Sequence, residues 1–445
     1  MAVLKGVILV GGPSVGTQFR PLSMGVPKPL FPIAGSPMIY HHVNALAKLP
    51  GMKEILLVGF FEKEVFDRFL ADVQLEFNTI SIRYLREYQS LGTGGGLYHF
   101  RDEILRGNPD KFFVLNADIA CSFPLDSMLA FDSQKKATAT IMGFKVEKKL
   151  VTKFGCVVLN PETAEVLHFV EKPETVLSDT ISTGIYLFNK DIFNVMAEAI
   201  SGLRAKALED GVYDSGNASD SRPSLLTSNQ EERIRLEHDV LSLLAAGKKL
   251  YCYVGVQNRD FWMQLKTGSS TIPANRLYLQ HFKVNAPRRL SHIPTSALTA
   301  SPGVSSPTSP GGFVSNIIQP VWIHPTANVH PSARIGPNVS VGPRAVIGRG
   351  VRVKDAIILD NVEIKNDSCV LNAIIGWDSR IGAWSRVEGA PGESLQLNAT
   401  YKGMKVPSAC ILGRNVSVAD EIAVRNCIVL PHKELKTSFH NEVLM

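Results

Sequence analysis

The chain has 445 residues, of which 45% are hydrophobic and 20% charged, with a formal net charge of +6. This length allows two or three domains with a substantial core. The mild charge, without a dense cluster of basic and aromatic residues, does not favour nucleic acid as a partner. Six scattered cysteines without a CxxC pair predict reduced thiols. The first apolar run is too short for a signal peptide or membrane span, so we expect a cytoplasmic protein without a membrane partner.

The N-terminus combines a strand pattern with a glycine-rich turn. Residues 7–10 are β-branched or aliphatic and predict a buried strand. The turn that follows contains Gly11, Gly12, Gly16 and Thr17. Backbone N–H groups exposed in such a turn bind phosphate oxygens, and the nearby cations Arg20 and Lys28 favour a polyphosphate. A tight surface turn with two solvated cations is the alternative.

The next segments alternate between helix and strand patterns. Apolar residues recur at helical spacing in 36–50 and 62–75, whereas 54–60 and 80–85 have strand patterns. This alternation predicts a parallel sheet with helices on both faces, an α/β Rossmann-like fold. The glycine-rich turn would then lie at the carboxyl end of the first strand, where such sheets bind ligands.

Two further segments supply groups for the same edge of the sheet. Residues 91–97 read LGTGGGL, and their glycines would let the backbone approach a flat or close neighbour. A flexible loop at a helix start is the alternative. Residues 112–118 predict a buried strand that ends in the carboxylate of Asp118, a candidate ligand for a divalent cation that bridges phosphates. A helix cap is the alternative for Asp118.

The middle of the chain has one segment without a clear period. Residues 203–233 are rich in Ser, Asp, Gly and Asn and predict a mobile surface insertion. A helix at 237–241 and a strand at 250–256 follow. His238 is expected to be structural or exposed, because no partner pattern marks it as a base.

The C-terminal part has a different repeat. A Pro-, Ser- and Gly-rich stretch at 285–320 predicts a linker between domains 1–284 and 321–445. Beyond it, aliphatic residues recur every six positions at Ile323, Val329, Ile335, Val341, Ile347 and Val353. A period of six builds a parallel β-helix. The register slips near Asp355, and a loop at 390–407 interrupts the repeat.

Beyond that loop the period is expected to return at Val416, Ile422 and Ile428. His324 and His330 leave open a repeat-domain acyltransferase with a histidine base, although both lie in ordinary repeat rungs.

Several motifs resemble those of sugar-1-phosphate nucleotidyltransferases, and most closely the GDP-mannose pyrophosphorylase family with its alpha, regulatory-type subunits. The motifs are Val10-Gly11-Gly12, Gly16-Thr17, Arg20-Pro21-Leu22, 27–35, 169–173, 375–389 and 428–433. The resemblance covers nearly the whole chain apart from the linker and 203–233. It implies a nucleotidyltransferase domain followed by a left-handed β-helix, with GTP or GDP-mannose as ligand and Mg²⁺ as cofactor.

The resemblance also implies roles for individual residues. Arg20 and Lys28 correspond to catalytic cations, Gly92, Gly94 and Gly95 to the base-binding segment, and Asp118 to the first metal ligand. Glu171 and Lys172 correspond to groups that contact the sugar and its phosphate, and Ser182 and Gly184 to the sugar-contacting strand, in which serine replaces an asparagine.

Three departures from the family pattern predict impaired catalysis. The phosphate loop is longer, with 13–15 between Gly12 and Gly16. Gln18 replaces an arginine and cannot stabilise the charge of a leaving pyrophosphate as well. Gln264 occupies the second metal-ligand position, where an amide binds magnesium more weakly than a carboxylate.

We therefore expect a subunit that binds GDP-mannose and regulates a catalytic beta-type GDP-mannose pyrophosphorylase subunit within a homo- or hetero-oligomer. The alternative is an active mannose-1-phosphate guanylyltransferase, in which neighbouring residues replace the missing groups. The loop 390–407 would reach toward the partner, unless it is a plain surface excursion.

Overall fold

The computed structural model describes residues 2–12, 17–89, 91–213, 234–291, 316–390, 399–401, 404–406 and 409–445. The chain packs into two compact units, Met1–Ser14 with Ile39–Trp262, and Val15–Met38 with Met263–Met445. Each unit is therefore discontinuous in sequence, and the domain boundaries predicted at 284 and 321 stay predictions. No helix among the described residues combines the length and apolar character needed to span a membrane.

The first unit is built on a nine-stranded sheet, seven of whose strands have the order β10-β9-β11-β6-β1-β4-β5, with β8 paired to β11 and β12 paired to β8. Its strands are β1 (Leu4–Gly11), β4 (Met52–Gly59), β5 (Ser81–Arg86), β6 (Lys111–Asn116), β8 (Ala139–Lys145), β9 (Gly155–Leu159), β10 (Val166–Glu171), β11 (Thr180–Phe188) and β12 (Leu250–Val254). Strands β6, β1, β4 and β5 are parallel, as predicted, whereas β11 is antiparallel to β6.

Helices cover both faces of this sheet. They are α1 (Met38–Ala47), α2 (Glu64–Glu76), α3 (Gly92–His99), α4 (Arg101–Leu105), α5 (Leu125–Lys135), α6 (Lys148–Val151), α7 (Ile192–Tyr213), the π-helix η5 (Leu236–Val240) and α8 (Leu241–Ala246). Val7 of β1 belongs to the core cluster with Leu97 and Ile104, whereas a Cβ on the adjacent Gly6 would lie 2.7 Å from Leu46 of α1. Adjacent strand residues point to opposite faces, so the two contacts lie on opposite sides of the sheet.

Helix α7 corrects one sequence-based prediction. It continues through Tyr213 and therefore includes 203–213, which we assigned to an irregular insertion. The rest of that insertion, 214–233, lies outside the described residues. Polar composition alone suggested an irregular segment here. The helix begins at Ile192, and its first turns are anchored by the buried side chains of Ile192 and Met196.

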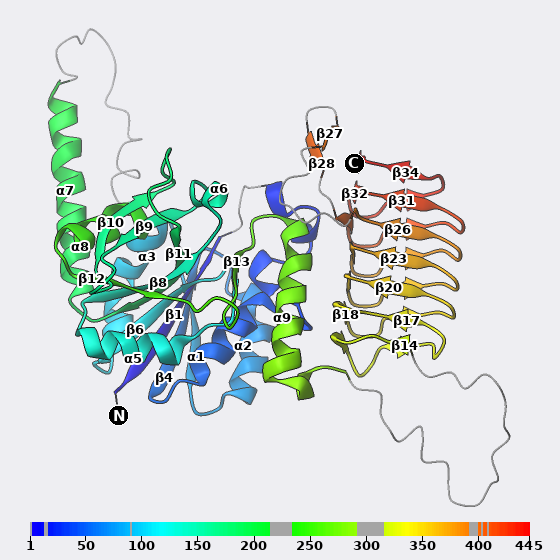
Figure 1. Cartoon of the computed structure of the whole chain (residues 1–445), viewed down its shortest axis with the longest axis horizontal. Coiled ribbons are helices and arrows are strands. Elements are labelled where there is room, and N and C mark those ends of the chain that lie inside the picture. Colours follow the sequence, from blue (N-terminus) through cyan, green and yellow to red (C-terminus); the bar gives the residue numbers. More distant parts are fainter. Residues whose placement is uncertain are drawn as a thin grey trace, which may run out of the picture. The chain divides into compact units, whose positions relative to one another are not determined.

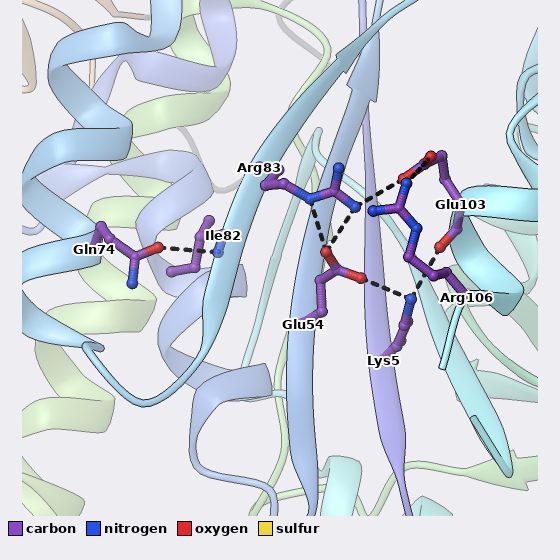
Figure 2. A network of polar contacts seen from close by, with 7 residues as sticks. All are labelled: Lys5, Glu54, Gln74, Ile82, Arg83, Glu103 and Arg106. Atoms are coloured by element: carbon purple, nitrogen blue, oxygen red, sulfur yellow. Dashed lines mark hydrogen bonds and ion pairs between the residues drawn. The ribbon is translucent and has the colours of Figure 1, made fainter. Parts of the chain in front are cut away.

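A network of charged side chains lies near the amino ends of the parallel strands (Figure 2). Lys5 Nζ is 2.7 Å from Glu54 Oε2, and Arg83 is 2.7 Å from Glu54 Oε1 and 2.9 Å from Glu103 Oε2. Lys5 is only 4% exposed and also donates to the Glu103 carbonyl at 2.9 Å. Each buried charge thus has an opposite charge or a carbonyl as partner.

The second unit contains a parallel β-helix, as predicted, whose strands form three sheets that are stacked coil upon coil (Figure 1). The first sheet has β14 (Asn316–Ile317), β17 (Arg334–Ile335), β20 (Arg352–Lys354), β23 (Cys369–Leu371), β26 (Arg386–Glu388), β31 (Ala423–Arg425) and β34 (Phe439–His440). The second has β15 (Val321–Ile323), β18 (Val339–Val341), β21 (Ile357–Ile358), β24 (Ala373–Ile375), β29 (Cys410–Leu412), β32 (Ile428–Val429) and β35 (Val443–Leu444). The third has β16 (Asn328–Val329), β19 (Val346–Ile347), β22 (Glu363–Ile364), β25 (Arg380–Ile381), β30 (Ser417–Val418) and β33 (Glu434–Leu435).

The pairing of successive coils explains the predicted slip in register. Ile335 pairs with Val353, but Val353 pairs with Val370, because the coils become one residue shorter near Asp355. Beyond the loop the period returns with one position wrong. Val416 and Ile422 lie in the core of the coil as predicted, beside the inward row of Val418, Val424 and Val429. Ile428 pairs with the outward Ile411, because the coil is one residue shorter there and Cys427 takes the inward position.

The outer face of the second sheet is covered by the rest of its own unit. Ile357, Ile374 and Ile411 point outward from the coil yet are at most 2% exposed. A Cβ on Gly268 would lie 3.3 Å from Ile411 and 3.2 Å from Leu22. The segment 17–38 therefore belongs to the β-helix unit.

Helix α9 links this covering segment to the coil. The Ala34 N–H donates to Asn275 Oδ1 at 2.8 Å, and Asn275 Nδ2 donates to the Asn338 carbonyl at 3.4 Å. The covering elements are η1 (Thr17–Phe19), η2 (Leu22–Met24), η3 (Lys28–Leu30), β2 (Pro32–Ile33), β3 (Ser36–Pro37), η6 (Gly268–Ser270), α9 (Thr271–Asn285) and η7 (Pro287–Arg289).

Candidate functional site

The parallel strands of the first unit end at one edge of the sheet, where Gly11, Gly12 and Asp118 lie. Strand β1 ends at Gly11, whose carbonyl accepts the Phe60 N–H at 2.8 Å. The Ala117 N–H donates to Leu9 at 3.0 Å and holds the chain after β6 against β1. Gly11 ends β1, Gly12 follows it, and Asp118 lies two residues beyond the neighbouring strand β6. Gly16 lies outside the described residues.

Strand β11 brings Ser182 and Gly184 to the same edge. A Cβ on Gly184, which has φ of 79°, would lie 2.7 Å from Asn116 Nδ2, so glycine permits this close approach. Ser182 Oγ and Asn116 Oδ1 are buried and have no hydrogen-bond partner among the described residues. Because buried polar atoms are nearly always hydrogen-bonded, these two atoms mark a place that suits a polar ligand.

The backbone of β11 is held between these two positions by its neighbours. Trp262 Nε1 donates to the Thr183 carbonyl at 2.8 Å, and Thr183 Oγ1 donates to the Met142 carbonyl at 2.8 Å. The Trp262 ring packs edge-to-face on Phe154 at 5.2 Å. The orientation of Ser182 and Gly184 is therefore fixed by strand packing.

Glu171 ends β10, on the other side of β9 from β11, and Lys172 follows it. Glu171 pairs with Gly155, where a Cβ would lie 2.9 Å from Glu171 Oε2. Lys172 Nζ is 3.9 Å from Glu171 Oε1, and its side chain is 66% exposed. Residue 156 of β9 pairs with residue 181 of β11, so strand β9 lies between this charged pair and Ser182. The structure thus gathers Gly11, Asp118, Ser182, Gly184, Glu171 and Lys172 along one edge.

Gly92, Gly94 and Gly95 lie in helix α3, so the segment is helical and the alternative of a flexible loop is wrong. The N–H groups of Gly94 and Gly95 donate to the Ile234 carbonyl at 2.9 and 3.3 Å. A Cβ on Gly92 would lie 2.5 Å from the same carbonyl oxygen. The glycines do permit close approach, as predicted, but by the chain itself, and their contact with a nucleotide stays a prediction.

Glu87 is a candidate that the sequence analysis missed. It follows β5, and its N–H donates to the Gly59 carbonyl at 2.7 Å, at the edge that holds Asp118. Its carboxylate lies so close over Gly96 that a Cβ there would clash. Burial raises the pKa of the Glu87 carboxyl to about 7. The signal was an acid two residues beyond the predicted strand 80–85, a pattern close to the one that drew attention to Asp118.

The predicted catalytic cations belong to the second unit. Arg20 and Gln18 are exposed, and Thr17 begins η1. Lys28 begins η3, and its Nζ is 5.9 Å from the centroid of the Phe19 ring, within the range of a cation–π contact. Gln264 ends β13 (Trp262–Gln264) and is assigned to this unit as well.

The donors available for magnesium are few. Within the described ranges, no group of three or more His, Cys, Asp or Glu residues is placed to hold a metal ion. Asp118 offers one carboxylate and Gln264 an uncharged amide, whereas magnesium prefers carboxylates and water. One carboxylate in the first unit is a poor donor set for this ion, so we assign no step to the metal.

Comparison with known proteins agrees with this architecture. A nucleotidyl transferase family model matches residues 5–217, and a model described as the GMPPB C-terminal domain matches residues 317–444. The fold and the edge of polar groups thus define a nucleotidyltransferase-type protein with a β-helix domain.

Full-length relatives define the family more narrowly. The chain is 45% identical to mannose-1-phosphate guanylyltransferase regulatory subunit alpha-A of Danio rerio and 46% identical to mannose-1-phosphate guanyltransferase alpha-A of Xenopus laevis, over 100% of each chain. It is 43% identical to the regulatory subunit alpha of Dictyostelium discoideum, over 99% of this chain and 98% of the relative. The chain belongs to the mannose-1-phosphate guanylyltransferase family, among its alpha or regulatory subunits.

Proposed function

We propose that this chain binds GDP-mannose and regulates a catalytic beta-type guanylyltransferase subunit in GDP-mannose biosynthesis, with little or no turnover of its own. Relatives of full length carry the name regulatory subunit alpha, which implies a catalytic partner. We place the assembly, a homo- or hetero-oligomer, in the cytoplasm.

One observation carries the binding part of the proposal. Ser182 Oγ of β11 and Asn116 Oδ1 of β6 are both buried, on neighbouring strands, without a hydrogen-bond partner in the described part of the chain. Sugar hydroxyls both donate and accept hydrogen bonds, so they would satisfy a hydroxyl and an amide oxygen at once. Glu171 and Lys172 lie on the other side of β9, where they would contact further sugar hydroxyls and a phosphate.

The loss of charge supports weak turnover. Gln18 and Gln264 are both neutral, at positions where the family has an arginine and a metal-binding aspartate. Removing one preorganised electrostatic group from a site of acyl transfer costs about 10²–10³ in rate, and phosphoryl transfer depends on such groups at least as strongly. Two such changes would leave ligand binding and remove most catalysis.

Two measurements on the purified chain test this proposal. Calorimetry with GDP-mannose, with and without magnesium, should show binding in both conditions. A steady-state assay with GTP, mannose-1-phosphate and magnesium should show slow or no turnover. Rates of about 10 s⁻¹, ordinary for enzymes, would instead establish an active guanylyltransferase.

That active enzyme is the second candidate function. The Xenopus laevis relative is named a guanyltransferase without reference to regulation. An acyltransferase gains no support from the surroundings of its proposed bases. His324 Nδ1 lies 2.9 Å from Thr326 Oγ1, and His330 Nδ1 lies 2.9 Å from Ser332 Oγ, so each ring bonds the hydroxyl two residues further on.

The regulatory part of the proposal centres on the loop 390–407. Its described part includes the antiparallel pair β27 (Ala399–Tyr401) and β28 (Met404–Val406). The base of the loop is fixed to the coils, because Asn372 Nδ2 donates to the Ala390 carbonyl at 2.7 Å and the Ala390 N–H donates to Asn426 Oδ1 at 2.6 Å. Deleting 391–406 should change the activity of the partner subunit and its response to GDP-mannose. Unchanged partner kinetics would identify the loop as a surface excursion.

A further inference from the structure

Aromatic rings connect Lys28 to a corner of the β-helix within the second unit. Lys28 Nζ lies 5.9 Å from the Phe19 centroid, and Phe19 packs edge-to-face on Phe31 at 5.6 Å. Phe31 packs edge-to-face on Trp377 at 5.9 Å, and the guanidinium carbon of Arg414 lies 5.3 Å from the Trp377 ring. The three rings are at most 7% exposed. The row therefore starts at a predicted phosphate-binding cation and ends at a second cation on the coil.

The coil end of this row is rigid. The Asn415 N–H donates to the Trp377 carbonyl at 2.7 Å, and the Asp378 N–H donates to the Asp360 carbonyl at 3.0 Å. Trp377 and Arg414 each follow a glycine at the same corner of consecutive coils, since Ile375 pairs with Leu412. The corner is thus fixed by backbone hydrogen bonds on both sides, independently of the segment that rests on it.

Arg414 touches the covering segment directly. A Cβ on Gly25 would lie 3.4 Å from the Arg414 guanidinium carbon, so the guanidinium lies against the backbone between η2 and η3. Arg414 Nε is also 3.7 Å from Asp378 Oδ2. One side chain therefore contacts the Trp377 ring, the adjacent coil and the segment that carries Lys28.

We infer that Trp377 and Arg414 are positioning residues, which hold Lys28 in place through Phe31 and Phe19. This inference rests on the proposed binding of GDP-mannose. The lysine side chain is long and flexible, and its ammonium contributes most to anion binding when its direction is fixed beforehand. The ring of Phe19 restricts the direction of the lysine side chain. Trp377 holds Phe31, and Phe31 in turn holds Phe19.

Hydrogen exchange tests the packing without any ligand. The N–H groups of Leu30 and Phe31 donate to the carbonyls of Pro27 and Lys28, so their exchange reports on the order of η3. In Trp377→Ala, exchange at these two amides should accelerate about tenfold, which corresponds to the loss of one ring contact. Trp384→Ala is the matched control, because Trp384 is 65% exposed on the same β-helix, and it should leave exchange unchanged.

Calorimetry with GDP-mannose tests the functional consequence. Trp377→Ala should weaken binding about tenfold, and Arg414→Gln about threefold, whereas Trp377→Phe retains a ring and should restore most of the affinity. Arg414→Gln and Trp377→Phe keep the test valid if Trp377→Ala fails to fold.

The outcomes separate this inference from the proposed function. A wild-type chain that does not bind GDP-mannose refutes the proposed function. Wild-type binding together with unchanged exchange at residues 30–31, or unchanged affinity in both Trp377→Ala and Arg414→Gln, refutes the positioning role alone. Faster exchange together with weaker binding supports it.

Discussion

The two ends of the parallel strands in the first unit differ in whether their buried polar groups have partners. Near the amino ends, Lys5, Glu54, Arg83 and Glu103 bond one another (Figure 2). At the carboxyl ends, buried oxygens of Asn116 and Ser182 have no partner within the described ranges. Paired charges fix the strands in place, whereas unpaired polar atoms cost free energy unless a ligand satisfies them. The comparison separates a structural polar cluster from a candidate binding site on the same sheet.

Removing one charge from the network near the amino ends of the strands should have the largest effect on the free energy of unfolding. Glu54→Gln removes the charge that faces Lys5, which is 4% exposed, and leaves a buried ammonium without a counter-charge. Losing one partner of a buried ion pair destabilises a protein by about 3–5 kcal/mol. Urea unfolding at pH 7 measures this change. The double variant Lys5→Met with Glu54→Leu replaces both charges by apolar groups and should recover much of the loss.

The pH dependence of this cluster has a definite sign. Burial raises the pKa of the Glu54 carboxyl, but hydrogen bonds and charges from Lys5 and Arg83 outweigh burial and hold this pKa below its ordinary value of 4.5. The stabilisation is therefore present above pH 4.5 and is lost as the pH falls through the lower folded-state pKa. A Glu54→Gln variant that loses stability as steeply as the wild type below pH 4.5 would contradict this origin.

At the unpaired end, Gly184→Ala should have an intermediate effect. A Cβ at this position would lie 2.7 Å from Asn116 Nδ2, on a backbone with φ of 79°. The strain should cost about 1–3 kcal/mol of unfolding free energy and displace Asn116 from the edge, so GDP-mannose affinity should fall as well. Chemical unfolding and calorimetry measure the two effects. Gly202→Ala is the control, because a Cβ there meets no atom within 4 Å and φ is not positive.

Features that depend on local sequence patterns could be predicted, whereas features that depend on long-range packing could not. Alternating periods located the parallel strands, and the six-residue period located the β-helix, because both depend on local patterns. The covering of the second sheet by 17–38 depends on long-range packing. Its signal was adjacent aliphatic residues at 357–358 and 374–375, typical of strands buried on both faces.

The candidate site was predictable in its location but not in its details. Asp118 stood out because it follows an apolar strand. Glu87 follows a strand too, but its distinguishing feature, burial over Gly96, arises only when α3 packs beside β5. Likewise, the sequence could not show that Gly94 and Gly95 bond the Ile234 carbonyl, which comes from a segment far along the chain.

Glu87 provides the smallest predicted effect and tests whether the binding edge stores unfavourable free energy. Burial raises the pKa of its carboxyl from 4.5 to about 7, so the folded chain keeps this proton longer than the unfolded chain does. Stability should therefore fall as the pH rises from 4.5 to about 7. Glu87→Gln removes this dependence. It should match the wild type near pH 4 and exceed it by about 1 kcal/mol at pH 8, a figure reduced because the side chain is only partly buried.

Thermal unfolding across this pH range measures the difference between variant and wild type. Glu64→Gln, the same substitution on the exposed surface of α2, controls for the change in net charge. A wild type and Glu87→Gln variant that differ by the same amount at pH 4 and pH 8 would show that Glu87 is not destabilised by burial. The ionised carboxylate of Glu87 would then not lower the stability of the chain, and a ligand at this edge could not restore stability by neutralising it.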